Sequence, residues 1–108
     1  REPTWYVTYV QEGNTTEYAK DKLYSIEFKN TLTATMPNGA TIKGDWYADG
    51  EGSHSFYCRN LKKNGKIAGD IIAEKIWDIL NNAQSYEGDT NWLQIIQDKD
   101  IYIQLYNK

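Results

Sequence analysis

The segment Asp70–Ala83, DIIAEKIWDILNNA, decides how the rest of this chain can fold. Its apolar residues recur at the spacing of one helical face, at Ile72, Ile76, Ile79, Leu80 and Ala83. The other face is polar and carries Glu74, Lys75, Asp78 and Asn81. Asp70 can cap the first turn, because its carboxylate can accept hydrogen bonds from free backbone N–H groups. The pattern predicts an amphipathic helix that must bury its apolar face against a sheet.

The rest of the chain has the alternating pattern of β-strands separated by turn residues. Strands are predicted at residues 4–11, 23–29, 32–36, 41–48, 53–61, 84–87, 91–97 and 101–107. Residues 12–22 are polar and contain Gly13-Asn14, so we expect a connection there. Short strands joined by tight turns predict an antiparallel meander. The expected fold is therefore α+β and mostly β. It is a curled sheet or partly open barrel of about seven or eight strands, with the helix packed on it, in one domain of residues 1–108.

Alternation also predicts which side chains share a face of the sheet. In the first strand, one face is predicted to carry Trp5, Val7 and Tyr9, and the other Tyr6, Thr8 and Val10. In the strand at 53–61, His54, Phe56 and Cys58 are expected on one face, opposite Ser53 and Ser55. In the last strand the aliphatic set is the better core filler, namely Ile101, Ile103 and Leu105. That leaves Tyr102, Gln104 and Tyr106 pointing outward.

Composition excludes several classes of protein. A net charge of −3 over 108 residues provides no field to attract nucleic acid. The apolar runs are too short to span a membrane. Cys58 is the only cysteine, so neither an intramolecular disulfide nor a cysteine zinc cluster can form. The chain starts at Arg1 without a methionine, and we expect a trimmed or processed chain whose signal peptide would no longer be visible.

No pattern in the chain indicates catalysis or a cofactor. His54 is the only histidine, and its neighbours Ser53 and Ser55 are expected on the opposite face of a strand. Acidic residues occur in three turns, but none follows the twelve-residue calcium loop. We therefore expect no catalytic residue, no metal site and no cofactor, and a protein that is not an enzyme.

Residues Ile72–Lys108 resemble the C-terminal part of a META domain. The matching features are the acidic-led helix, an aromatic residue after it and two closing strands, carried here by Glu74, Leu80, Tyr86, Leu93, Ile95 and Ile101–Tyr106. The N-terminal half agrees in layout, with Trp5 in the first strand, the strand Tyr24–Phe28 and an Asn-Gly hairpin leading to Lys43-Gly44. META domains carry a Gly-Cys-Asn segment where this chain has Gly44-Asp45-Trp46, and their later Met-Ala-Cys is absent here.

This resemblance implies a non-enzymatic bacterial domain outside the cytoplasm, periplasmic or on a cell-surface lipoprotein. A lipocalin-like or other small secreted β-barrel family of a gut-type bacterium is the alternative. The expected partner is a protein or a cell-envelope component, and the oligomeric state is left open.

The surplus of aromatic residues is the functional signal in the sequence. Nine Tyr, four Trp and two Phe cannot all pack under one helix, so some rings should lie exposed in a row. Tyr102 and Tyr106 should lie about 13 Å apart at roughly 3.3 Å per residue. With Trp92 from the neighbouring strand they form the predicted binding residues. Two alternatives to this binding surface stay open. In the first, the sheet closes and both of its faces are used for packing and for amphipathic surface. In the second, the chain is a small-ligand or carbohydrate-binding barrel.

Overall fold

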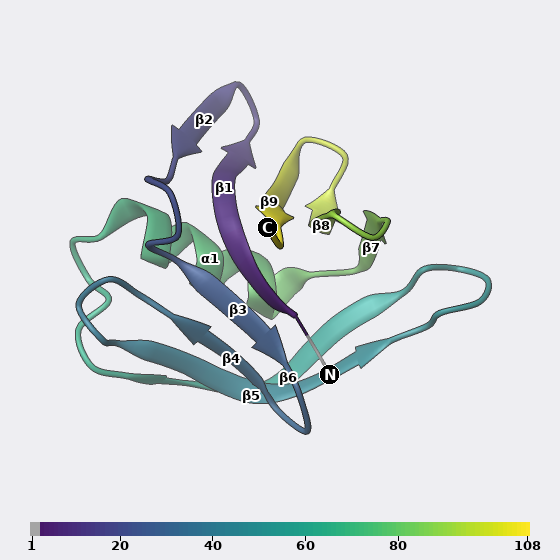
Figure 1. Cartoon of the computed structure of the whole chain (residues 1–108), viewed down its shortest axis with the longest axis horizontal. Coiled ribbons are helices and arrows are strands. Elements are labelled where there is room, and N and C mark those ends of the chain that lie inside the picture. The colour runs from purple at the N-terminus through teal and green to yellow at the C-terminus, as the bar shows by residue number, and fades with distance from the viewer. Residues whose placement is uncertain (1–2) are drawn as a thin grey trace.

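A computed structural model describes residues 3–108 as an antiparallel sheet curled around one helix (Figure 1). The elements, in chain order, are β1 (Thr4–Glu12), β2 (Thr15–Tyr18), β3 (Ser25–Phe28), β4 (Leu32–Thr35), β5 (Thr41–Ala48), β6 (Phe56–Asn64), α1 (Ile71–Asn82), β7 (Ser85–Gly88), β8 (Trp92–Asp98) and β9 (Ile101–Tyr106). The sheet order is β6-β5-β4-β3-β1-β9-β8-β7, and β2 pairs with β1 outside this order. The predicted mostly-β fold, a curled half-barrel with one helix packed on it, is confirmed.

Helix α1 begins and ends where the sequence predicts. The Asp70 side chain accepts a hydrogen bond from the Ala73 backbone N–H at 3.1 Å, which is an N-cap. The helix buries Ala73, Ile76, Ile79 and Leu80. Ile76 is 1% exposed, which confirms its predicted place in the core. Figure 1 shows α1 on the inner side of the curled sheet, behind β1 in that view.

Lys75 departs from the predicted polar face of the helix. Its side chain is only 14% exposed and forms an ion pair with Glu12, at the end of β1. The long lysine stem reaches past the apolar stripe, so the polar side of the helix also contacts the sheet.

The two edge strands of the sheet meet at one end. Ser55, just before β6, forms a bridge with Ser85 of β7. The Phe56 N–H donates to the Gln84 carbonyl at 3.1 Å, and the Tyr86 N–H donates to the His54 carbonyl at 3.0 Å. Strand β6 also packs against α1, which contacts β8, β9 and β1 as well. The half-barrel is thus drawn together at one end and filled by the helix at the other.

Three sequence predictions about the strands are wrong. Residues 15–18, expected within a connection, form β2, because Gly13 at φ +65° makes a turn that returns the chain along β1. In β1 the pairing with β9 shifts between Val7 and Tyr9, a β-bulge. The bulge buries Val7 and Val10 on one side and turns Tyr9 to the same side as Tyr6.

The third error concerns β6, which was expected over residues 53–61. It begins at Phe56, because His54 has φ +55° and cannot continue a strand. The hydroxyl groups of Ser53 and Ser55 lie 2.6 Å apart. The strand then runs on to Asn64, and its pairing with β5 shifts where Asn60 takes φ +58°.

Candidate functional site

The outer side of β1, β9 and β8 carries a continuous group of aromatic and amide side chains. We call this the tyrosine face; its residues are Tyr6, Tyr9, Trp92, Gln94, Tyr102, Gln104 and Tyr106. Strand register places them in rows. Tyr106 of β9 pairs with Tyr6 of β1 on one side and with Trp92 of β8 on the other. In the next outward row Gln104 lies between Tyr9 and Gln94.

Contacts between the rings hold the tyrosine face in one arrangement. The ring centres of Tyr6 and Tyr106 are 6.0 Å apart, as are those of Tyr9 and Tyr102. The hydroxyl oxygens of Tyr9 and Tyr102 lie 3.3 Å apart, within hydrogen-bond distance. The Gln94 amide donates to the Gln104 side-chain oxygen at 2.8 Å. Since these side chains are already ordered, a ligand would lose little of their rotamer entropy on binding.

The middle of the tyrosine face is electrically neutral at physiological pH. The hydrogen bond with Tyr102, together with burial, raises the pKa of Tyr9 to about 12. The hydrogen bond from the Tyr106 hydroxyl to Asp21 raises the pKa of Tyr106. The charged groups beside it are Asp21, which accepts the hydrogen bond from Tyr106, and Lys22, whose Nζ is 5.7 Å from the centre of the Tyr6 ring. The face therefore suits a neutral ligand better than an ion.

The structure brings two of the three predicted binding residues into direct register. Trp92 and Tyr106 are neighbours across β8 and β9, and Tyr102 lies further along β9 on the same side. The predicted register of the last strand is confirmed, because Ile103 and Leu105 are 0% exposed. Trp92 is 39% exposed. Tyr102 and Tyr106 are half-buried instead of fully exposed, since Tyr9 and Tyr6 pack against them.

Sequence reasoning missed Tyr6 and Tyr9 as members of this face. Strict alternation placed Tyr9 with Trp5 and Val7, and the bulge after Val7 reverses that assignment. The sequence could not reveal the bulge, because every residue around it is aromatic or β-branched and suits either face of the sheet. Trp5, also counted among the surplus rings, lies on the inner side of the sheet.

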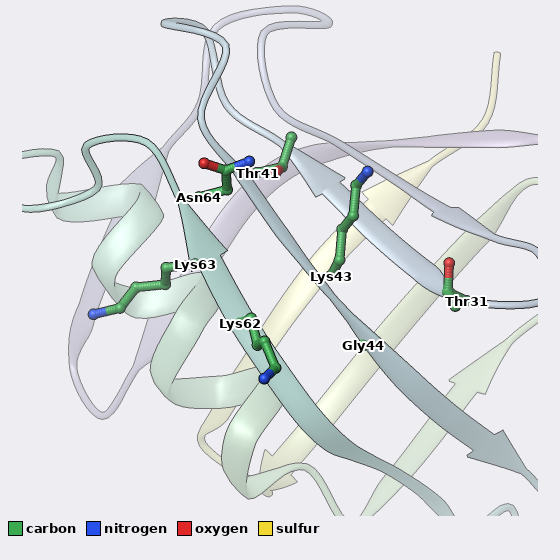
Figure 2. A pocket seen from close by; sticks show the side chains of 7 residues that line it. All are labelled: Thr31, Thr41, Lys43, Gly44, Lys62, Lys63 and Asn64. Carbon is green, nitrogen blue, oxygen red and sulfur yellow. The ribbon is translucent and has the colours of Figure 1, made fainter.

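A basic hollow lies on the sheet at β5 and β6 (Figure 2). It has a volume of about 440 Å³ and is lined by Thr31, Thr41, Lys43, Gly44, Lys62, Lys63 and Asn64. Lys43 and Lys62 are partners in the strand register, and no carboxylate among residues 3–108 forms an ion pair with either. Lys63 turns toward the helix, where its Nζ lies 4.7 Å from the centre of the Trp77 ring. Exposed ammonium groups of this kind bind anions weakly, because water screens their charge.

The residues considered for catalysis lie near the end where β6 meets β7. The His54 ring stacks on Tyr86 with ring centres 5.0 Å apart, and its Nδ1 is 3.9 Å from Glu87. Within residues 3–108 no serine hydroxyl forms a hydrogen bond with His54; the Ser53 hydroxyl donates to Asp49 at 3.1 Å.

Burial raises the pKa of the Cys58 thiol to about 12, so this thiol is protonated at neutral pH.

Two further observations concern the described part of the chain. Across residues 3–108 no group of three His, Cys, Asp or Glu side chains is arranged to hold a metal ion. The one helix found there, α1, is too short to cross a membrane.

Comparison with known proteins places the chain in a family. A family model described as a domain of unknown function, DUF4847, matches residues 2–107. The chain belongs to the DUF4847 family. A crystal structure of a DUF4847 family protein from Bacteroides vulgatus ATCC 8482 is similar, with a TM-score of 0.74 and 27% sequence identity. The match covers 98% of this chain and 92% of the Bacteroides chain, so the two share the fold over nearly their whole lengths.

No curated protein sequence matches this DUF4847 chain. The family match does not show membership of the META family, so the resemblance to META domains remains a prediction.

Proposed function

We propose that this DUF4847 domain is a non-catalytic binding domain that acts outside the cytoplasm, with the tyrosine face as its binding surface for a neutral polysaccharide of the cell envelope. The observation that carries this proposal is the row Tyr6, Tyr106 and Trp92 across three neighbouring strands. Neighbouring strands lie about 4.8 Å apart, so the row spans roughly 10 Å. That distance suits a short run of sugar rings lying across the strands.

The chemistry of the tyrosine face supports a sugar more than a charged partner. The C–H side of a sugar ring can stack on an aromatic face, as other apolar surfaces do. The amides of Gln94 and Gln104 and the phenol groups can exchange hydrogen bonds with sugar hydroxyls. Trp92, at 39% exposure, offers the most accessible ring of the row. A protein partner would use the same rings, because Tyr and Trp dominate the energetics of protein interfaces.

The localisation is a separate part of the proposal. It is supported by the resemblance to META domains, which are extracytoplasmic and often carried by lipoproteins. Fractionation of the cells that produce this protein tests it: we expect the chain in the periplasmic or envelope fraction. Recovery in the cytosolic fraction would contradict this part and leave the binding surface to be tested on its own.

Affinity electrophoresis tests the binding surface. The purified domain is run in native gels that contain neutral polysaccharide extracted from the envelope of the producing cells, or soluble mannan, xylan or a mixed-linkage β-glucan. We expect retardation in at least one gel. For Trp92→Ala we expect a dissociation constant at least tenfold higher than that of the wild type. Tyr57→Ala is the matched control, because Tyr57 on β6 is 38% exposed but lies outside the tyrosine face.

The control defines the outcomes that would contradict the proposal. Equal migration of the wild-type domain in all gels would reject a neutral polysaccharide as the ligand. Equal losses for Trp92→Ala and Tyr57→Ala would show that binding does not depend on the tyrosine face.

A further inference from the structure

A second concave site lies on the inner side of the sheet, on the opposite side from the tyrosine face. We call it the aromatic cavity; it has a volume of about 220 Å³ and is lined by Trp5, Phe28, Trp46, Ala48, Phe56, Tyr86, Leu93 and Ile95. These residues come from six strands, β1, β3, β5, β6, β7 and β8. The sequence predicted no site here, because the lining joins six strands that lie far apart in the chain.

The cavity exists because α1 fills only part of the half-barrel. The helix residues Ile76, Ile79 and Leu80 are fully buried against the sheet. At the cavity, by contrast, Trp5 and Trp46 remain half-buried although they lie on the inner side. The bridge between Ser55 and Ser85 holds β6 against β7 and so keeps the walls curved around the space.

The rings that form the wall are held in place before any ligand binds. The Trp46 indole N–H donates to the Lys29 carbonyl at 2.8 Å, and the Tyr86 hydroxyl donates to the Asp49 carbonyl at 2.8 Å. Phe28 packs edge-on against Trp46 with ring centres 5.0 Å apart, and against Phe56 at 6.1 Å. A preformed apolar pocket of this kind binds ligands without first reordering its side chains.

The wall chemistry selects a neutral ligand. The lining contains no acidic or basic side chain, so an ion entering it would lose its hydration without gaining a partner. Two of the three side-chain donors in the lining, on Trp46 and Tyr86, are already bonded to backbone carbonyls, and the third is the Trp5 indole N–H. Aromatic walls favour aromatic guests, which can pack edge-to-face or offset against them. His54 stacks on Tyr86 with ring centres 5.0 Å apart but is not itself part of the lining.

The volume gives a scale for the group that the cavity can hold. An apolar cavity of roughly 150 Å³ in another protein takes up benzene. A volume of about 220 Å³ therefore has room for one or two fused rings, but it is short of the lower end of drug-sized pockets. We propose that the aromatic cavity binds a small neutral aromatic molecule of one or two fused rings. This proposal does not depend on the tyrosine face.

The four tryptophans of the chain report on this proposal independently of one another. The ¹⁵N-labelled domain is titrated with 2-naphthol, and the four indole N–H signals are assigned with Trp→Phe variants. We expect saturable shifts at Trp5 and Trp46, which line the cavity, and none at Trp77 of α1 or Trp92 of the tyrosine face. Unshifted Trp5 and Trp46 signals would overturn the proposal. A shift at Trp92 alone would assign the binding to the tyrosine face instead.

Filling the cavity should abolish the response. Ala48→Met adds volume from β5, and we expect it to weaken 2-naphthol binding at least tenfold. Ala68→Met is the matched control, since Ala68 is exposed and outside the cavity. If Ala48→Met does not fold, Leu93→Phe fills the same space from β8. Wild-type affinity in a folded filling variant would overturn the proposal.

A second ligand of different size and charge completes the test. Hexadecanoate, a long charged chain, should bind at least tenfold more weakly than 2-naphthol. Equal or tighter binding of hexadecanoate would overturn the assignment of a small neutral aromatic ligand. Because the tyrosine face is tested with polysaccharides and Trp92→Ala, failure of one proposal leaves the other measurable.

Discussion

The contact between Tyr24 and Asp70 ties the first turn of α1 to the start of β3, and it can be removed in two ways. The Tyr24 hydroxyl donates to the two carboxylate oxygens of Asp70 at 2.9 and 2.8 Å. Asp70 in turn accepts from the Ala73 N–H, as the N-cap of the helix. Tyr24 is only 9% exposed, and removal of the Asp70 carboxylate leaves its hydroxyl without this partner. We therefore expect Asp70→Ala to cost more than the loss of a helix cap.

The size of the effect follows from the two roles of Asp70. Loss of an N-cap costs about 0.5–2 kcal/mol of unfolding free energy. A buried hydroxyl left without a partner costs about 1–3 kcal/mol more. Asp70→Ala should therefore destabilise the domain by about 1.5–5 kcal/mol. Tyr24→Phe should lower the free energy of unfolding by about 1–2 kcal/mol, because Asp70 still caps the helix and its carboxylate still has some access to solvent.

A double-mutant cycle measures the contact itself. Urea unfolding followed by circular dichroism gives the free energy of unfolding of the wild type, both single variants and the double variant. Because both single variants lose the same hydrogen bond, we expect a coupling energy of about 1–2 kcal/mol. Asp78→Ala is the control, since Asp78 is exposed in the same helix, and it should change stability by less than about 0.5 kcal/mol. A coupling energy below about 0.3 kcal/mol would refute the reasoning.

Three further predictions concern the core, one strand glycine and the tyrosines. Ile76→Ala should cost about 2–5 kcal/mol in urea unfolding, and an unchanged midpoint would mean that α1 is peripheral. Gly44→Ala should destabilise by about 1–3 kcal/mol, because its new Cβ would lie 2.9 Å from a β6 carbonyl oxygen. Gly50→Ala, with no atom within 4 Å, should be nearly neutral, and equal effects would remove the packing explanation. The raised pKa of about 12 for Tyr9 and Tyr24 favours the protonated form in the folded state. The contribution of these two tyrosines to the free energy of unfolding is thus fully present below a pH of about 10, and it is lost as the pH rises toward 12. Absorbance at 295 nm should show this late titration, and complete ionisation of all tyrosines near pH 10 in the folded domain would contradict it.

Local sequence pattern was enough to determine the main elements of the fold. The helix at 71–82 and the strand at 41–48 have the bounds that their patterns predict, the helix with Asp70 as its cap. The burial of Ile103 and Leu105 also follows from simple alternation. These predictions succeed because helix capping and the spacing of side chains on one face depend only on neighbours a few residues away. Buried faces are apolar, so the spacing of apolar residues shows which face is buried.

The candidate site was predictable only where the strands are regular. The outward positions of Trp92, Tyr102 and Tyr106 follow from the alternation of β8 and β9. The places of Tyr6 and Tyr9 do not, because a bulge in β1 changes which residues face outward. A bulge is selected by the pairing of β1 with β9, whose residues are far away in the sequence, so it leaves no local signal.

Closure of the half-barrel and the aromatic cavity were decided by tertiary structure alone. The bridge between Ser55 and Ser85 depends on the curvature of the whole sheet, and His54 leaves the strand pattern beside it at φ +55°. The wall of the cavity joins Trp5 to Trp46 and Tyr86 only after six strands have taken their order. The sequence by itself determined which segments are helical or extended and which side chains prefer burial. Which of those apolar side chains are covered by α1, and which are left lining an open space, depends on the length and placement of one helix against a curved sheet.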